Sequence, residues 1–157
     1  SGSGGTVMAD LLRSSGDGDA RNQLHGAVGV GFLPSVDVRL DDAPSWATPA
    51  SQKLCYSAMR KNGVTMDSAN ARAQALVACD VVWMLEATLE AAGKVLNQDT
   101  FLQGLAQIGP QDAEPTSGMG LAVSATRRDG NATAAYVKFF DQCVCFRYTS
   151  GRFPVPN

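Results

Sequence analysis

Two short segments near the start of the chain combine glycines with polar side chains in a pattern that suits ligand binding. Gly2-Ser3-Gly4-Gly5-Thr6 precedes a predicted helix, so its N–H groups, its hydroxyls and the helix dipole favour an anion. The second segment is Ser15-Gly16-Asp17-Gly18-Asp19. A linker or an ordinary cap is the alternative for the first segment, and a solvated turn for the second. Polar loops at the ends of consecutive α/β units are where open α/β sheets bind ligands, which predicts a site formed by Ser3, Gly4, Gly5, Thr6 and Asp17.

Other groups able to do chemistry are few. Asp80 interrupts the apolar stripe of a long predicted helix, so its carboxylate needs hydrogen bonds or a cation, and we favour a structural role for it. His25 is the single histidine and has no nucleophile pattern beside it, which leaves no basis for a Ser-His-Asp triad or a histidine-rich metal site. We therefore predict no catalytic residue, no metal site and no cofactor, and we expect the chain not to be an enzyme.

The four cysteines, Cys55, Cys79, Cys143 and Cys145, allow three full pairings, or they stand as four buried thiols. Cys55 and Cys79 fall on neighbouring predicted helices joined by a short loop, so a bridge between them is geometrically reasonable. Cys143 and Cys145 are expected on the same face of one strand, where a direct bridge would be strained. We therefore predict a Cys55–Cys79 disulfide, which suits an exported protein.

The bulk composition excludes several classes of function. A net charge of −2 with 13 scattered basic residues argues against nucleic acid as a partner. Hydrophobic residues make up 45% of the chain and charged residues 18%, which excludes a disordered class. No apolar run reaches the ~18–20 residues that span a bilayer, and the first residues do not form a signal sequence.

Periodicity and capping signals place the elements that would position these residues. The predicted helices cover 20–24, 49–62, 67–93 and 98–109, and the predicted strands cover 26–32, 121–126, 133–141 and 144–148. Asp67 is the predicted cap of the helix at 67–93, whose apolar stripe we expect to pack against a sheet. Asp129-Gly130-Asn131 is predicted to form the hairpin turn between the strands at 121–126 and 133–141. The long connection at 33–48 indicates a crossing between two lobes.

The second half of the chain carries an ordered set of motifs. The segment at 79–93, CDVVWMLEATLEAAG, resembles the "YDAVxLLxxAIxxAG" helix of the type I periplasmic binding proteins, the branched-chain amino-acid-binding family of ABC-transporter receptors. A short helix at 101–105, a Gly-rich stretch at 116–120 and a turn at 126–131 follow in the family's order. Upstream, the segment at 26–34 resembles the family's "GxxGxxxxxP" strand, and the segments at 1–13 and 15–19 resemble two loops of the ligand cleft.

The resemblance implies an α/β fold: a partial type I periplasmic-binding-protein fold with a parallel sheet flanked by helices and with antiparallel C-terminal strands. Residues 1–40 would belong to the second ligand-binding lobe, 41–118 to the inter-lobe crossing and the helices of the first lobe, and 119–157 to the C-terminal strands and tail. The first lobe's own strands are not among these motifs. At 157 residues the chain therefore corresponds to a part of a two-lobed receptor.

The implied function is capture of a small polar ligand, such as an amino acid or a similar carboxylate, outside the cytoplasm (in the periplasm or on a cell-surface lipoprotein). Ser3 to Thr6 would hold the ligand carboxylate, Asp17 would accept from a ligand cation, and a membrane permease would recognise the closed receptor. Two alternatives stay open. One is a ligand-sensing domain of the same fold in signalling, and the other is an α/β enzyme of unknown reaction that uses the Ser3-Gly4 loop or Asp80.

Overall fold

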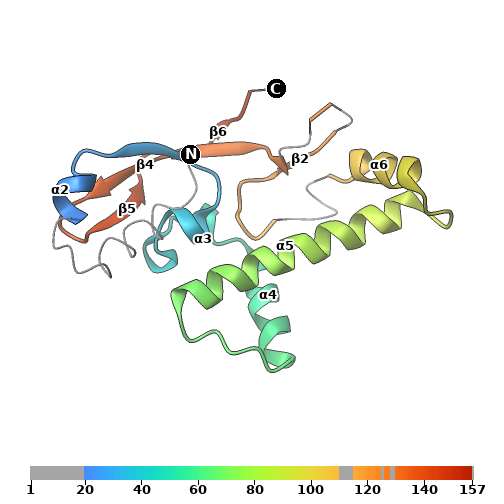
Figure 1. Ribbon diagram of the computed structural model, residues 1–157, viewed down its shortest axis with the longest axis horizontal. Helices are drawn as coiled ribbons and strands as arrows, with labels where there is room; N and C mark the ends of the chain where they lie inside the picture. The colour runs from blue at the N-terminus through green and yellow to red at the C-terminus, as the bar shows by residue number, and fades with distance from the viewer. Residues whose placement is uncertain (1–19, 110–114, 125, 128–129, 157) are drawn as a thin grey trace.

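The computed structural model describes residues 20–109, 115–124, 126–127 and 130–156 (Figure 1). Helices and strands are both present, so the coarse α/β expectation is confirmed. In Figure 1 the three longest helices lie together, whereas the main sheet and the short helix α2 (Ala20–Leu24) lie at one end of the molecule. In the part of the chain that the structure describes, no helix has the length and apolarity needed to cross a membrane.

The main sheet is antiparallel throughout. It has the order β1 (Val28–Gly31), β4 (Thr133–Phe140) and β5 (Cys145–Tyr148), and β6 (Phe153–Pro154) pairs with the first residues of β4. The prediction of a parallel sheet is therefore wrong for the described strands. The physical reason is connectivity: a tight turn joins β4 to β5, and a turn that short reverses the chain direction.

A second, two-stranded sheet corrects the predicted hairpin. β2 (Leu121–Ala122) pairs with β3 (Gly130–Asn131), in the register Leu121 to Asn131 and Ala122 to Gly130. Gly130 and Asn131 are thus paired strand residues rather than the turn, and the strand predicted at 121–126 has only two residues. Glycine suits this position because Gly130 has a φ of +83°, a backbone conformation that costs other residues free energy.

The sheet buries one face. Along β4 the side chains of Ala135, Val137 and Phe139 are buried, whereas those of Tyr136 and Lys138 between them are exposed. This alternation is the pattern of an antiparallel strand with one solvated face. The buried face forms a cluster in which Val137 and Phe139 pack with Phe146 of β5 and with Val38.

Short helical turns occupy most of the connection that the sequence predicts as irregular. They are α3 (Pro34–Asp37), the 3-10 turn η1 (Leu40–Asp42) and the 3-10 turn η2 (Ser45–Ala47). Upstream, the predicted helical turn at 20–24 is confirmed as α2 (Ala20–Leu24). The connection then leads into α4 (Ala50–Lys61), close to the predicted helix at 49–62.

The two remaining helices form an antiparallel pair. α5 (Ala69–Ala92) begins at the cap residue Ser68, whose side chain accepts from the N–H of Ala71, so the predicted cap Asp67 is off by one residue. α6 (Gln98–Gln107) begins with a capping box formed by Asn97 and Thr100. The pair packs closely because Gly104 has no side chain: a Cβ there would lie 2.5 Å from the carbonyl oxygen of Thr88.

The environment of α5 differs from the prediction. It packs against α6, α4 and α3, and none of its main contacts is with a strand of the described sheets, as Figure 1 shows. Its apolar residues surround the helix more widely than one stripe. Leu76 and Cys79 are buried against α4, whereas an outer stripe stays exposed; the outer stripe consists of Val81, Val82, Leu85 and Leu89.

Candidate functional site

The predicted ligand-binding residues lie outside the described part of the chain. Ser3, Gly4, Gly5, Thr6 and Asp17 all fall before residue 20, as does Asp19. Their assignment stays a prediction. The described residues instead show how the neighbouring elements are fixed and where else polar groups converge.

The predicted disulfide between Cys55 and Cys79 is present. Their sulfur atoms are 2.09 Å apart and their Cα atoms 5.9 Å apart, inside the range that a disulfide requires. The bridge joins α4 to α5 within a buried cluster completed by Leu76. Tyr56, Met59 and Trp83 are partly buried and pack against that cluster.

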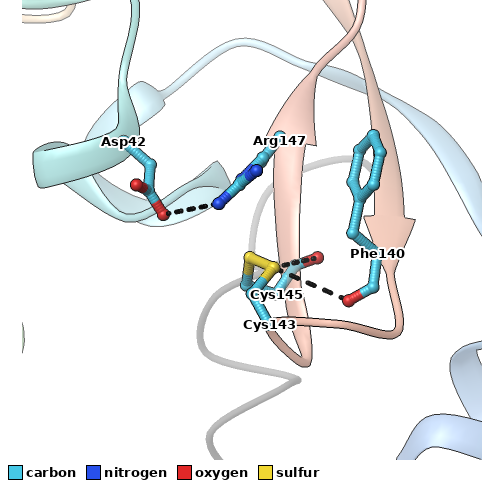
Figure 2. A network of polar contacts seen from close by, with 5 residues as sticks. All are labelled: Asp42, Phe140, Cys143, Cys145 and Arg147. Atoms are coloured by element: carbon cyan, nitrogen blue, oxygen red, sulfur yellow. Dashed lines mark hydrogen bonds and ion pairs between the residues drawn. A yellow bond between two sulfur atoms is a disulfide. The ribbon is translucent and has the colours of Figure 1, made fainter.

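A second disulfide joins Cys143 to Cys145, the pairing that we expected to be strained and did not predict. The expectation placed both cysteines on one face of a strand. Cys143 instead lies in the turn before β5, and Val144 adopts a φ of +48°, which brings the two Cα atoms to 5.1 Å. Figure 2 shows this bridge beside the carbonyl oxygen of Phe140, at the tip of the hairpin.

An ion pair connects the same hairpin to the connection at 33–48. Arg147 of β5 lies 3.6 Å from a carboxylate oxygen of Asp42 in η1 (Figure 2). The guanidinium carbon of Arg147 also lies 5.9 Å from the ring centre of Phe140. Both partners of the ion pair are partly exposed, so solvent screens the interaction and its role is to orient rather than to stabilise.

Asp80 has the structural role that the sequence favours. One carboxylate oxygen accepts from the N–H of Thr116 at 2.7 Å, and the other accepts from the Thr116 hydroxyl at 3.0 Å. Burial raises the pKa of the Asp80 carboxyl, and the two hydrogen bonds from Thr116 act in the opposite direction. The carboxylate thus fastens the Gly-rich segment at 116–120 to α5.

His25 contacts no nucleophile among the described residues. Its Nδ1 atom lies 2.9 Å from a carboxylate oxygen of Asp141, and both side chains are largely exposed. The pair joins the end of α2 to the end of β4. His25 is therefore a surface residue at the end of a helix.

Sequence reasoning missed a buried pair formed by Asp37 and Tyr148. The Tyr148 hydroxyl donates to Asp37 Oδ2 at 2.9 Å, and the N–H of Leu33 donates to the same oxygen at 2.7 Å. Burial, followed by the charge of Asp37, raises the pKa of the Tyr148 hydroxyl. Gly31 makes room for the pair, because a Cβ there would lie 2.5 Å from Asp37 Oδ2. No local motif signals this contact, since its partners lie 111 positions apart.

A pocket with a volume of about 200 Å³ opens between α4, α5 and the loop that joins them. Its lining includes two guanidinium groups, a phenol and a carboxylate, and it consists of Tyr56, Arg60, Val64, Thr65, Met66, Asp67 and Arg72. The hydroxyl of Tyr56 is buried and has no hydrogen-bond partner among the described residues. Sequence reasoning missed this pocket as well; the one available signal is the spacing of Tyr56 and Arg60, which share a helix face.

The described residues contain no group of three or more His, Cys, Asp or Glu side chains placed to hold a metal ion. Comparison with known proteins adds no further assignment: no family model, curated protein or solved structure matches the chain. Function must therefore be argued from the residues and their contacts.

Proposed function

We propose that the chain is the later part of an extracytoplasmic solute-binding protein that captures a small polar ligand, such as an amino acid, for an ABC transporter. The observation that carries the proposal is the outer stripe of α5. This helix contains the segment that resembles the family's "YDAVxLLxxAIxxAG" helix, and Val81 and Val82 on it are 55% and 59% exposed. A contiguous apolar patch of this kind marks a surface that another element covers.

In the proposed receptor, the first lobe's sheet would cover the outer stripe. Residues 41–118, which include α4, α5 and α6, would then be helices of that lobe, and residues 1–40 would belong to the second lobe. This arrangement retains the expectation that the stripe packs on a sheet, but the sheet is not one of the two described.

The disulfides support the extracytoplasmic part of the proposal. All four cysteines are paired in two bridges, one buried between helices and one at a hairpin tip. Structural disulfides persist in oxidising compartments and are rare where glutathione keeps thiols reduced. An exported receptor meets the oxidising condition.

Binding would proceed by closure of the two lobes around the ligand. Ser3, Gly4, Gly5 and Thr6 would donate hydrogen bonds to a ligand carboxylate, and Asp17 would accept from a ligand cation. The ligand shifts the open–closed equilibrium by its difference in affinity for the two states, and a permease would recognise the closed state. No covalent step is involved.

Calorimetry of the full-length protein against amino acids and small carboxylates tests the proposal. We expect one ligand class to bind, and Asp17→Ala to weaken it at least about tenfold, because a charge-assisted hydrogen bond is lost. Asp99→Ala, at an exposed position on α6, is the matched control and should leave affinity unchanged. Unchanged affinity in Asp17→Ala removes the acceptor role, and turnover of the ligand would favour an enzyme instead.

A further inference from the structure

The pocket between α4 and α5 has two polar walls held at a fixed separation. Tyr56 and Arg60 stand four positions apart on α4, so they lie on the same face, and Arg72 faces them from the first turn of α5. The Cys55–Cys79 disulfide immediately beside Tyr56 joins the two helices. The pocket therefore lies where a disulfide joins two helices, and none of its lining residues belongs to the predicted ligand segments at 2–6 and 15–19.

Three donors converge in this pocket without partners. Among the described residues, neither Arg60 nor Arg72 forms an ion pair, and the Tyr56 hydroxyl is buried with no hydrogen bond. Burial raises the pKa of the Tyr56 hydroxyl, although the nearby Arg72 and Arg60 lower it, so the hydroxyl keeps its proton at neutral pH. Buried hydroxyls normally form a hydrogen bond, so the Tyr56 hydroxyl is available to donate to a ligand oxygen.

The charges that line the pocket limit which kind of anion could bind there. Two guanidinium groups face one carboxylate, that of Asp67, and a second carboxylate, Asp41, is near enough to Tyr56 to raise its pKa. A phosphate group carries between one and two negative charges at neutral pH and would meet repulsion from both carboxylates. A carboxylate carries a single charge and fits the planar fork of a guanidinium.

We propose that this pocket binds a small monocarboxylate, with its carboxylate between Arg60 and Arg72 and a short apolar tail against Val64 and Met66. The pocket volume of about 200 Å³ suits a ligand of a few heavy atoms, because pockets that bind drug-sized ligands have volumes of roughly 300–1,000 Å³. A ligand oxygen that enters between the two arginines also supplies the acceptor for the Tyr56 hydroxyl.

Isobutyrate is the probe for the test, titrated into the full 157-residue chain while the amide signals are followed by NMR. We expect saturable shifts for Thr65, Met66 and Asp67, with a millimolar Kd. Arg60→Gln and Arg72→Gln should each weaken binding about tenfold or more, since each removes a charge-assisted pair. Tyr56→Phe should weaken it about three- to tenfold, because it removes one hydroxyl and keeps the ring.

The control is Arg21→Gln, which removes an exposed guanidinium on α2 outside the pocket and should leave the Kd unchanged. Intact mass without reduction checks that both disulfides persist in each variant. The absence of saturable shifts up to about 100 mM isobutyrate overturns the proposal, as does equal weakening in the control. Tighter binding of inorganic phosphate than of isobutyrate overturns the assigned ligand class. None of these outcomes depends on the loops at 2–6 and 15–19.

Discussion

At the scale of single residues, buried polar groups join segments that are distant in sequence. Thr116 is the clearest case, because it donates two hydrogen bonds to Asp80 while its carbonyl oxygen accepts from Gln52 Nε2 at 2.8 Å. The same amide group donates to the carbonyl of Ala47 at 2.8 Å. The segment around Thr116 is thus fastened to α4 and to α5, and the Gln52 side chain also ties α4 to the turn η2. Such networks are costly to break in part, since each orphaned group keeps its desolvation penalty.

The first prediction concerns the pH dependence that Asp80 imposes. Its pKa in the folded chain is raised by burial, so the folded state binds more protons than the unfolded state above the ordinary value of 3.8. The stability difference between the wild type and Asp80→Asn should therefore fall as pH rises from below 3.8 through the raised pKa, and then stay level. Urea unfolding of both proteins between about pH 3 and pH 7 measures it. A difference that grows with pH would mean that the bonds from Thr116 outweigh burial.

The second prediction concerns the buried pair of Asp37 and Tyr148. Tyr148→Phe removes the hydroxyl that donates to a carboxylate only 1% exposed, and we expect a loss of about 1–3 kcal/mol in the free energy of unfolding. Tyr136→Phe is the matched control because that ring is 54% exposed, and it should change stability by less than about 0.5 kcal/mol. Equal effects of the two substitutions, in denaturant unfolding, would contradict a structural role for the pair.

At the scale of elements, helices were predictable and sheets were not. The limits of α4, α5 and α6 follow from local signals, such as the Asn97 cap and the periodic apolar residues of 69–92, which act within a few positions. β1 pairs with β4 more than 100 positions later, in the register Val28 to Lys138, and no local pattern specifies such a partner or its direction. The Cys55–Cys79 bridge was predictable because both helices and their short connection were.

The same division applies to the candidate sites. Gly-rich polar loops have a composition that the sequence displays, so they could be proposed without coordinates. The α4–α5 pocket depends instead on how Arg72 of one helix faces Tyr56 and Arg60 of another. The Cys143–Cys145 bridge depends on the left-handed conformation of Val144, a residue type that rarely adopts it.

The third prediction tests the close packing of α5 and α6. Glycine to alanine inside an exposed helix usually stabilises, by up to about 1 kcal/mol. Gly104→Ala should destabilise instead, by about 1–3 kcal/mol, because the new Cβ would meet backbone atoms of Thr88 and Ala92 that cannot turn aside. Gly151→Ala, where the added Cβ meets nothing within 4 Å, is the control. Thermal unfolding of both variants measures the difference, and stabilisation by Gly104→Ala would contradict the packing.

At the scale of the whole molecule, α5 separates a packed side from an unpacked one. Successive residues of a helix turn by about 100°, so Val81, Val82, Leu85 and Leu89 fall within an arc of roughly 100°, on the side away from buried Leu76 and Ala87. The Cys55–Cys79 disulfide fixes this orientation, because α4 packs on the side of Leu76 and Cys79, away from the stripe. The outer stripe is therefore a property of the fold rather than of one loose side chain.

The last prediction uses the outer stripe to test the proposed receptor. Leu85 is 46% exposed in this chain, so Leu85→Gln should change its free energy of unfolding by less than about 0.5 kcal/mol. In the proposed receptor a sheet would cover the stripe, so the same substitution would bury an amide and remove an apolar contact. We expect it to lower the free energy of unfolding of the full-length protein by about 2–4 kcal/mol. Glu90→Gln, exposed on the same helix, should be nearly neutral in both proteins. Denaturant unfolding of the two proteins gives the comparison. A small effect of Leu85→Gln in both would show that no element covers the stripe, and would remove the observation on which the receptor proposal rests.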